Sequence, residues 1–201
     1  MMNSVVETKG EVVTSPQQKH IPGELGIWVF VAGDLMVFAA FFVVIALGHN
    51  GEQAEIFAQS RATLDMWVGV LNTFLLLTGS WFVAKGVEKC RSIHSHAASR
   101  YFSAGILCGL LFVANKSFEW GGKIIVGINP MTNDFFMYYF VFTGIHLLHV
   151  FVGLGVLLLV RNASRRQTIG RNDIRTIESG ATFWHLVDLL WIVLFALFYL
   201  L

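Results

Sequence analysis

Residues 135–160, FFMYYFVFTGIHLLHVFVGLGVLLLV, decide the fold of this chain. The stretch runs for 26 residues without Asp, Glu, Lys or Arg, which is long enough for a helix to cross a lipid bilayer with some tilt. His146 and His149 lie near its middle, three residues apart, so they share one helical face. An imidazole that faces lipid is costly, so this face is expected to point into protein.

The composition of the whole chain also indicates a membrane location. Of the 201 residues, 55% are hydrophobic and 13% are charged, and the mean hydropathy is +0.64. With these values the chain is not expected to fold as one or two soluble domains. A net charge of +1 gives no reason to expect nucleic acid or an acidic partner. Cys90 and Cys108 show neither a CxxC motif nor metal-ligand spacing, so we interpret both as unpaired thiols.

We predict an all-α integral membrane bundle of five transmembrane helices, preceded by a flexible polar tail over residues 1–23. At about 1.5 Å per residue, each predicted span matches the thickness of the hydrocarbon layer. The spans cover about residues 25–47, 66–84, 101–121, 135–160 and 181–201, within one membrane domain of residues 24–201. Gly105 and Gly109 form a GxxxG pattern, which we interpret as close packing inside the bundle.

Lys and Arg predict the orientation of the bundle. Eleven of them fall in the tail and in the loops after the second and fourth spans: Lys9, Lys19, Lys85, Lys89, Arg91, Arg100, Arg161, Arg165, Arg166, Arg171 and Arg175. The opposite side has two, Arg61 and Lys123. The positive-inside rule therefore predicts a cytoplasmic N-terminus and an external C-terminus.

Several ionisable side chains fall deep inside the predicted spans. Asp34 is a third to halfway along the first span, and His185 and Asp188 lie three residues apart on one face of the fifth. A carboxylate at such depth tends to be protonated or paired. We therefore expect His–Asp pairing within or between the fourth and fifth spans. His146 and His149 of the fourth span and His185 of the fifth are the candidate partners for Asp188.

Other polar side chains in the spans are expected to pair within their own helix or to bond to a neighbouring helix. Lys116 and Glu119 are three residues apart and are expected to form a pair within the third span. Hydrogen bonds between helices are expected from Asn72, Thr73, Thr78 and Ser80 of the second span. All of these groups have two interpretations, structural bonding that holds the helices together and the lining of a proton or lipid path.

Two alternative functions follow from the same residues. A haem-carrying electron-transfer anchor would need His146 or His149 to face His185 across two helices. The spans hold too few histidines for a two-haem anchor with four ligands or for a haem–copper centre, so we assign neither a metal site nor a catalytic residue. A small stand-alone transporter could line a path with Asp34 and the histidines, but we find no inverted repeat or broken helix.

Four motifs in the right order resemble subunit III of the haem–copper oxidase superfamily, over nearly all of the chain after residue 22. The most specific motif runs from Glu178 to Trp191 and is similar to the family's E…WHxxDxxW signature, with Trp184, His185 and Asp188 inside it. Residues 143–150, TGIHLLHV, are similar to TGxHxxHV. Residues 71–77 are similar to the family's NTxxLL helix, and Glu119 with Trp120 matches a Glu followed by an aromatic residue.

The resemblance is closest to the short bacterial form, which has five helices where mitochondrial subunits III have seven. The family's carboxylate in this first helix is usually Glu in cytochrome c oxidases, whereas this chain has Asp34 within Gly33–Met36. Asp occurs there in quinol oxidase subunits III and in NorE-type proteins associated with nitric oxide reduction. Residues 20–28 and 132–140 look most like the NorE-type branch.

The resemblance implies an accessory subunit of a respiratory enzyme of the bacterial inner membrane, an oxidase or a nitric oxide reductase. Such a subunit carries no redox cofactor of its own, packs on a catalytic subunit that holds haem and copper, binds phospholipids, and supports proton uptake and stability. Asp34, Glu119, His146 and His149 would be candidates for the proton and lipid site. A structural network would comprise Asn72, Thr73, Lys116, Glu178, Trp184, His185, Asp188 and Trp191.

Overall fold

The computed structural model describes residues 25–48, 52–91, 95–165 and 170–200, and every regular element within these ranges is helical. In chain order the elements are α1 (Leu25–Gly48), α2 (Glu52–Ala62), α3 (Met66–Arg91), α4 (Ser95–Ile125), α5 (Asp134–Ala163), α6 (Arg171–Phe195) and the π-helical turn η1 (Ala196–Leu200). Five helices, α1 and α3 to α6, are long and apolar enough to cross a membrane, which confirms the predicted class. The tail predicted over residues 1–23 lies outside the described residues.

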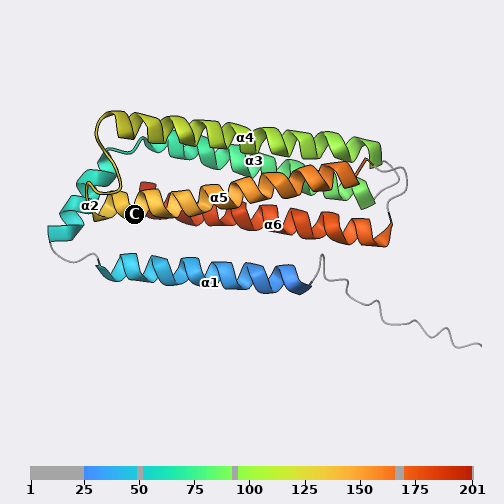
Figure 1. Cartoon of the computed structure of the whole chain (residues 1–201), viewed down its shortest axis with the longest axis horizontal. Coiled ribbons are helices and arrows are strands. Elements are labelled where there is room, and N and C mark those ends of the chain that lie inside the picture. Colours follow the sequence, from blue (N-terminus) through green and yellow to red (C-terminus); the bar gives the residue numbers. More distant parts are fainter. Residues whose placement is uncertain (1–24, 49–51, 92–94, 166–169, 201) are drawn as a thin grey trace, which may run out of the picture.

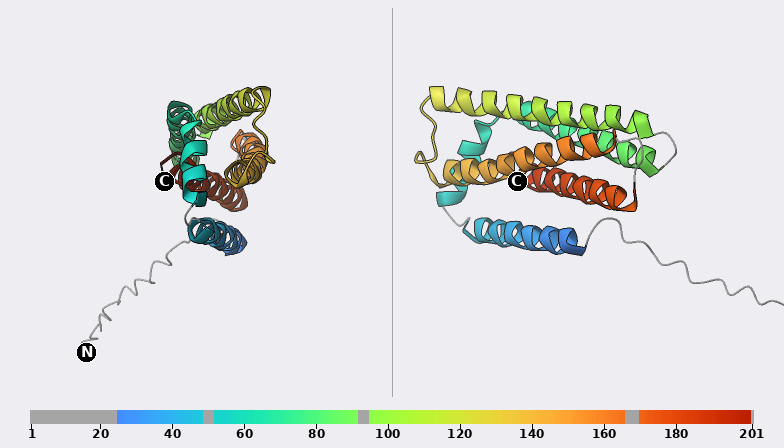
Figure 2. Two further views of the ribbon diagram at one scale, coloured as in Figure 1. Left: turned by 90° about the vertical axis from the view of Figure 1, so that its left-hand side faces the viewer. Right: turned by 45° about the vertical axis from the view of Figure 1, so that its right-hand side comes forward.

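Helices α3 to α6 form an antiparallel bundle, and α1 lies alongside it (Figure 1). The most extensive helix pairing is between α3 and α4, while α6 contacts α1, α3 and α5. Looking along the bundle, α1 stands at the edge next to α6 (Figure 2). Only 6% of the apolar window of α1 is buried, against 56% for that of α6. The first span is therefore held by few contacts, and the last is the centre of the bundle.

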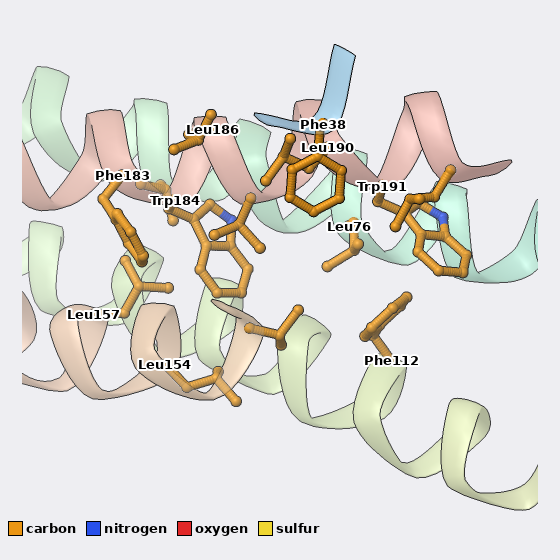
Figure 3. Packing of buried hydrophobic residues seen from close by; sticks show 14 of the residues in the cluster. Phe38, Leu76, Phe112, Leu154, Leu157, Phe183, Trp184, Leu186, Leu190 and Trp191 are labelled. Atoms are coloured by element: carbon orange, nitrogen blue, oxygen red, sulfur yellow. The ribbon is translucent and has the colours of Figure 1, made fainter. Parts of the chain in front are cut away.

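Trp184 and Trp191 of α6 fill the centre of the core, where both side chains are fully buried. Figure 3 shows Trp184 projecting towards Leu154 of α5 and Trp191 lying close to Phe112 of α4. Glycines on the facing helices make room for Trp184, because a Cβ added at Gly109 would lie 2.7 Å from its ring. Real Cβ atoms do not approach so closely, so the site requires glycine.

The GxxxG pattern serves the packing role predicted for it. A Cβ on Gly105 would lie 2.9 Å from Val83 Cγ2 and 3.3 Å from the Gly79 carbonyl oxygen, both on α3. Gly105 therefore lets α4 approach the backbone of α3, and Gly109 on the same helix accepts the Trp184 ring. Small residues allow such close contact between membrane helices.

The connection after α1 contains a helix that its polar sequence did not suggest. Helix α2 lies across one end of the bundle (Figure 1), where Phe57 meets Phe135 edge-to-face with ring centroids 5.4 Å apart. Asn133, which caps α5 by accepting from the Phe136 amide at 3.0 Å, also donates to Ser60 Oγ at 2.8 Å. The segment therefore covers the start of α5.

At the opposite end, the helices extend beyond the predicted spans. Helix α3 continues to Arg91 and α4 begins at Ser95, so most of the basic loop predicted between residues 84 and 101 is helical. Arg91 donates two hydrogen bonds to Glu178 Oε1, at 3.0 and 2.7 Å, and Arg161 donates to Ser103 Oγ at 2.7 Å. Apolar length sets where a helix leaves the hydrocarbon layer, and these polar contacts let it continue further.

Candidate functional site

Asp34 on α1 and His149 on α5 form a polar contact between the first helix and the rest of the bundle. Asp34 Oδ1 lies 3.4 Å from His149 Nε2, and the side chains are 14% and 17% exposed. Phe38, one turn further along α1, packs edge-on against the imidazole with ring centroids 6.3 Å apart. Asp34 Oδ2 is buried and makes no hydrogen bond within the described part of the chain.

The geometry of this pair fixes the position of one of its protons. His149 Nδ1 is 2.9 Å from the Ile145 carbonyl oxygen, which only accepts hydrogen bonds, so Nδ1 carries a proton. Nε2 then faces a carboxyl group, and a favourable contact needs one further proton, on Nε2 or on Asp34. The pair is thus a place where one proton can be held in either of two positions at membrane depth.

This pairing corrects the sequence-based expectation. We expected His–Asp pairs within or between the fourth and fifth spans, but His149 pairs with the first span, and Asp188 pairs with none of the three span histidines in the described structure. The expectation failed because residue spacing gives depth and face, but it does not say which neighbouring helix meets that face.

A second cluster lies towards the other end of the bundle from the basic loops. Lys116 Nζ donates to Glu119 Oε2 at 3.0 Å, to Tyr139 Oη at 2.8 Å and to Tyr199 Oη at 3.1 Å. Both tyrosine hydroxyls donate to Glu119 Oε1, at 2.7 and 2.5 Å. Lys116 and Glu119 are only 1% and 4% exposed. The predicted pair is confirmed, and it sits in a closed network that ties α4, α5 and η1 together.

His146 is fully buried but joins neither cluster. Its ring packs between Phe112, at a centroid distance of 5.7 Å, and Trp191, at 5.3 Å. Neither ring nitrogen makes a hydrogen bond within the described residues. His146 and His149 both point inward, as predicted, but they meet different neighbours.

The haem-anchor alternative gains no support from the histidine positions. His185 is exposed and bonds to Ser80 on α3, with Nδ1 2.5 Å from Ser80 Oγ, whereas His146 is enclosed by aromatic rings. Among the described residues, no three His, Cys, Asp or Glu side chains gather closely enough to hold a metal ion.

The motif from Glu178 to Trp191 on α6 makes hydrogen bonds to α3 at different heights along the bundle. Glu178 Oε1 accepts a hydrogen bond from Arg91 of α3, and Trp191 Nε1 donates to Thr73 Oγ1 on α3 at 3.0 Å. On the other side of α3, Asn72 Oδ1 accepts from Asn115 of α4 at 2.8 Å. Asn72, Thr73, Glu178 and Trp191 each form a hydrogen bond to a neighbouring helix, while Asp188 Oδ1 is buried without a partner in the described structure.

Sequence reasoning missed the partners that complete these clusters. Tyr139 and Tyr199 have the sequence context of ordinary aromatic residues in apolar spans, and Asn115 and Arg91 gave no distinctive signal for these contacts. The interhelical bond expected of Ser80 is confirmed by its contact with His185 on α6. The spacing of Tyr139 from Thr143 and His146 places it on the inward face of α5, which could have identified it. Tyr199 could not be found this way, because the π turn η1 changes the helical register at its position.

These features define a multi-pass α-helical membrane protein with paired polar side chains buried between its spans. A family model described as "Cytochrome c oxidase subunit III" matches residues 10–201, nearly the whole chain. The chain belongs to that family.

Curated relatives agree with this assignment. The cytochrome c oxidase subunit 3 of Thermostichus vulcanus is 26% identical over 203 aligned positions, which cover 100% of this chain and 98% of that protein. The cytochrome bo(3) ubiquinol oxidase subunit 3 of Buchnera aphidicola is 28% identical, and the alignment covers 87% of this chain and 84% of that protein. A probable quinol oxidase subunit 3 of Staphylococcus haemolyticus is 23% identical, with 88% of each chain covered.

Proposed function

We propose that this chain is a non-catalytic accessory subunit of a respiratory haem–copper terminal oxidase in the inner membrane of a bacterium. The match to the subunit III family over residues 10–201 carries the proposal, together with relatives named as the third subunits of cytochrome c and quinol oxidases. The partner is the catalytic subunit, which holds the haem and copper. The positive-inside rule orients the N-terminus towards the cytoplasm.

The Asp34–His149 pair is the site through which this subunit supports proton uptake. It holds one proton in two alternative positions, it is partly exposed, and Asp34 Oδ2 is available to a further hydrogen-bond partner. A carboxyl group that exchanges a proton with an adjacent imidazole suits transfer towards a neighbouring proton-consuming subunit. Glu119 is enclosed in its network with Lys116 and the tyrosines, and it contributes to stability instead.

Phospholipids occupy the outer surface of α1. Its described exposed side chains are apolar or small, and its apolar window is almost unburied by the rest of the chain. Acyl chains against this helix would complete the packing that the bundle leaves open, and they would keep α1 close enough for Asp34 to meet His149.

A nitric oxide reductase is the second candidate partner. The acid in the first span is Asp34 rather than Glu, and residues 132–140 look most like the NorE-type branch. The three relatives described above are oxidase subunits by name, so the oxidase is the first choice.

Purification of the tagged chain from its native membrane in mild detergent tests the proposal, with mass spectrometry and a visible spectrum of the eluate. We expect a larger multi-span subunit that carries haem, and that subunit's identity decides between oxidase and nitric oxide reductase. A chain that elutes alone with its own haem would favour the electron-transfer anchor. A chain that elutes alone and colourless would contradict a stable accessory subunit.

A further inference from the structure

The bundle has two kinds of outward surface at membrane depth. Along α5, the exposed side chains between the two ends of the helix are apolar or glycine: Met137, Val141, Ile145, Leu148, Phe151, Val152, Gly155, Leu158 and Leu159. Such a face suits acyl chains, which offer no hydrogen bonds.

The surface formed by α3 and α6, which we call the α3–α6 face, is different. On α6, His185, Leu189 and Ile192 are exposed and recur at four and three residues, so they form one outward stripe. On α3, Leu77 and Trp81 are exposed within one helical turn of Ser80, the residue that His185 contacts. Figure 2 shows that α6 lies between α3 and α1 when the bundle is viewed from its end. The contact of His185 with Ser80 places the stripe on the side of α6 that meets α3.

His185 places an unsatisfied polar group on this face. Nδ1 is bound to Ser80 Oγ at 2.5 Å, and Nε2 has no hydrogen-bond partner in the described part of the chain. His185 lies four residues inside the apolar run that begins at Ala181, and Ser80 lies four residues before its run ends at Ala84, so both are within their spans but nearer one end than the middle. Elsewhere in the described spans, exposed polar side chains lie near helix ends or, like Ser117, bond to their own backbone.

A lipid environment would leave His185 Nε2 without any partner, since hydrocarbon neither donates nor accepts hydrogen bonds. An unsatisfied polar group at that depth is expensive, and such residues normally face protein or water. A protein helix that brings a polar side chain to this position satisfies the nitrogen and also covers Leu189, Leu77 and Trp81.

We propose that the α3–α6 face docks a transmembrane helix of the catalytic partner subunit, and that a hydrogen-bonding side chain of that helix meets His185 Nε2. The proposal rests on the proposed function for the identity of the partner, and it adds the surface and the contact.

Ser80 also lies next to the Asp188 carboxyl. When the single hydroxyl proton goes to Asp188, His185 Nδ1–H donates to Ser80 Oγ and Nε2 becomes an acceptor. The matching group on the partner is then a donor, such as a hydroxyl, an amide or an indole.

Site-specific photo-crosslinking in native membranes tests the location of the interface. A benzophenone amino acid replaces Leu189 on the α3–α6 face or, as the matched control, Leu148 on the α5 face. Both leucines are mid-span and exposed, at 47% and 63%. We expect a product with the haem-carrying catalytic subunit from position 189 and none from position 148. That product from position 148 alone, or a dimer of this chain from position 189, would overturn the proposal.

Substitution of His185 tests the hydrogen bond. Loss of one bond to the partner should lower the recovery of the catalytic subunit with His185→Leu about tenfold in a competitive pull-down. His185→Gln retains a polar group and should recover most of the binding. Circular dichroism checks that both variants remain folded. Equal recovery of the partner with all three proteins would overturn the contact.

The two proposals fail in different ways. If the wild-type chain does not purify with a haem-carrying subunit, the proposed function fails. The docking face still stands if position 189, but not position 148, crosslinks to another integral membrane protein and His185→Leu abolishes that product. If the haem-carrying subunit purifies with the chain but crosslinks only from position 148, the function stands and the docking face is wrong.

Discussion

Two buried ionisable clusters in this bundle are built from similar groups but are completed to different degrees. In the Lys116 network, each charged or hydroxyl oxygen and nitrogen has a partner, and the side chains of Lys116 and Glu119 are at most 4% exposed. At the seam between α1 and α5, Asp34 and His149 meet at 3.4 Å, remain 14% and 17% exposed, and leave one carboxyl oxygen unbonded.

Under the proposed function, this difference distinguishes a structural cluster from one that takes part in proton uptake. A network whose donors and acceptors are all satisfied loses free energy on any rearrangement, so it holds α4, α5 and η1 in fixed positions. A pair with an unused acceptor and access to its surroundings can exchange a proton without breaking other bonds. Buried ionisable side chains therefore stabilise the fold in the Lys116 network, and the proposal assigns proton exchange to the Asp34–His149 pair.

The largest expected effect comes from Lys116→Met. The change leaves the Glu119 carboxylate buried without its cation, which should cost about 3–5 kcal/mol in the free energy of unfolding. Lys85→Met is the matched control, because Lys85 and Glu88 have the same spacing on α3 but are 41% and 59% exposed. Thermal unfolding in detergent measures both. Similar losses from the two substitutions would contradict a structural role specific to the Lys116 network.

His149→Leu should have the next largest effect. It leaves Asp34 without a partner between α1 and α5, at a cost of about 1–3 kcal/mol in the free energy of unfolding. Adding Asp34→Asn should restore part of that loss, since the double variant no longer has an unpaired acid. A double-mutant cycle of unfolding midpoints measures the coupling, and strictly additive effects would show that the two side chains do not interact.

Tyr199→Phe should cost about 1 kcal/mol of unfolding free energy, because Glu119 loses one of its hydrogen bonds and keeps those from Lys116 and Tyr139. Tyr138→Phe is the control, since Tyr138 lies on α5 beside Tyr139 and takes no part in the hydrogen bonds described for the network. A Tyr199 variant as stable as the Tyr138 variant would mean that the π turn does not anchor the end of α6.

Asp34→Asn should have the smallest effect on stability, within about 1 kcal/mol, because the amide keeps the shape of the side chain and an oxygen that faces His149. Its effect should appear in proton-coupled turnover instead. Thermal unfolding of this variant beside wild type checks the first part, and a loss as large as that of Lys116→Met would place Asp34 among the structural residues.

The sequence predicted the features that depend on spacing and length within one segment. Apolar runs gave the five spans, and the three-residue separation of Lys116 from Glu119 gave their pair. The glycines at 105 and 109 gave the close approach of helices. In each case the structural outcome follows from local helix geometry, which the chain specifies by itself.

Features that depend on which helices become neighbours could not be predicted in this way. The partner of His149 is on α1, more than a hundred residues away, and no periodicity relates the two. Helix α2 is polar by composition and is held by Phe57 and Ser60 against the start of α5. Tyr199 reaches Glu119 because the last turn is π-helical, and its sequence gives no separate signal for that change of register.

The central claim is that this chain is a non-catalytic subunit whose Asp34–His149 pair supports proton delivery. Oxygen consumption by the purified complex, followed over continuous turnover with wild-type chain, with Asp34→Asn, and without the chain, tests it most directly. We predict an unchanged haem spectrum in all three, the longest activity with the wild-type chain, a lower rate with Asp34→Asn, and the fastest loss without the chain. Loss of haem on removal of the chain, or an Asp34→Asn complex that matches wild type in rate and lifetime, would contradict the claim.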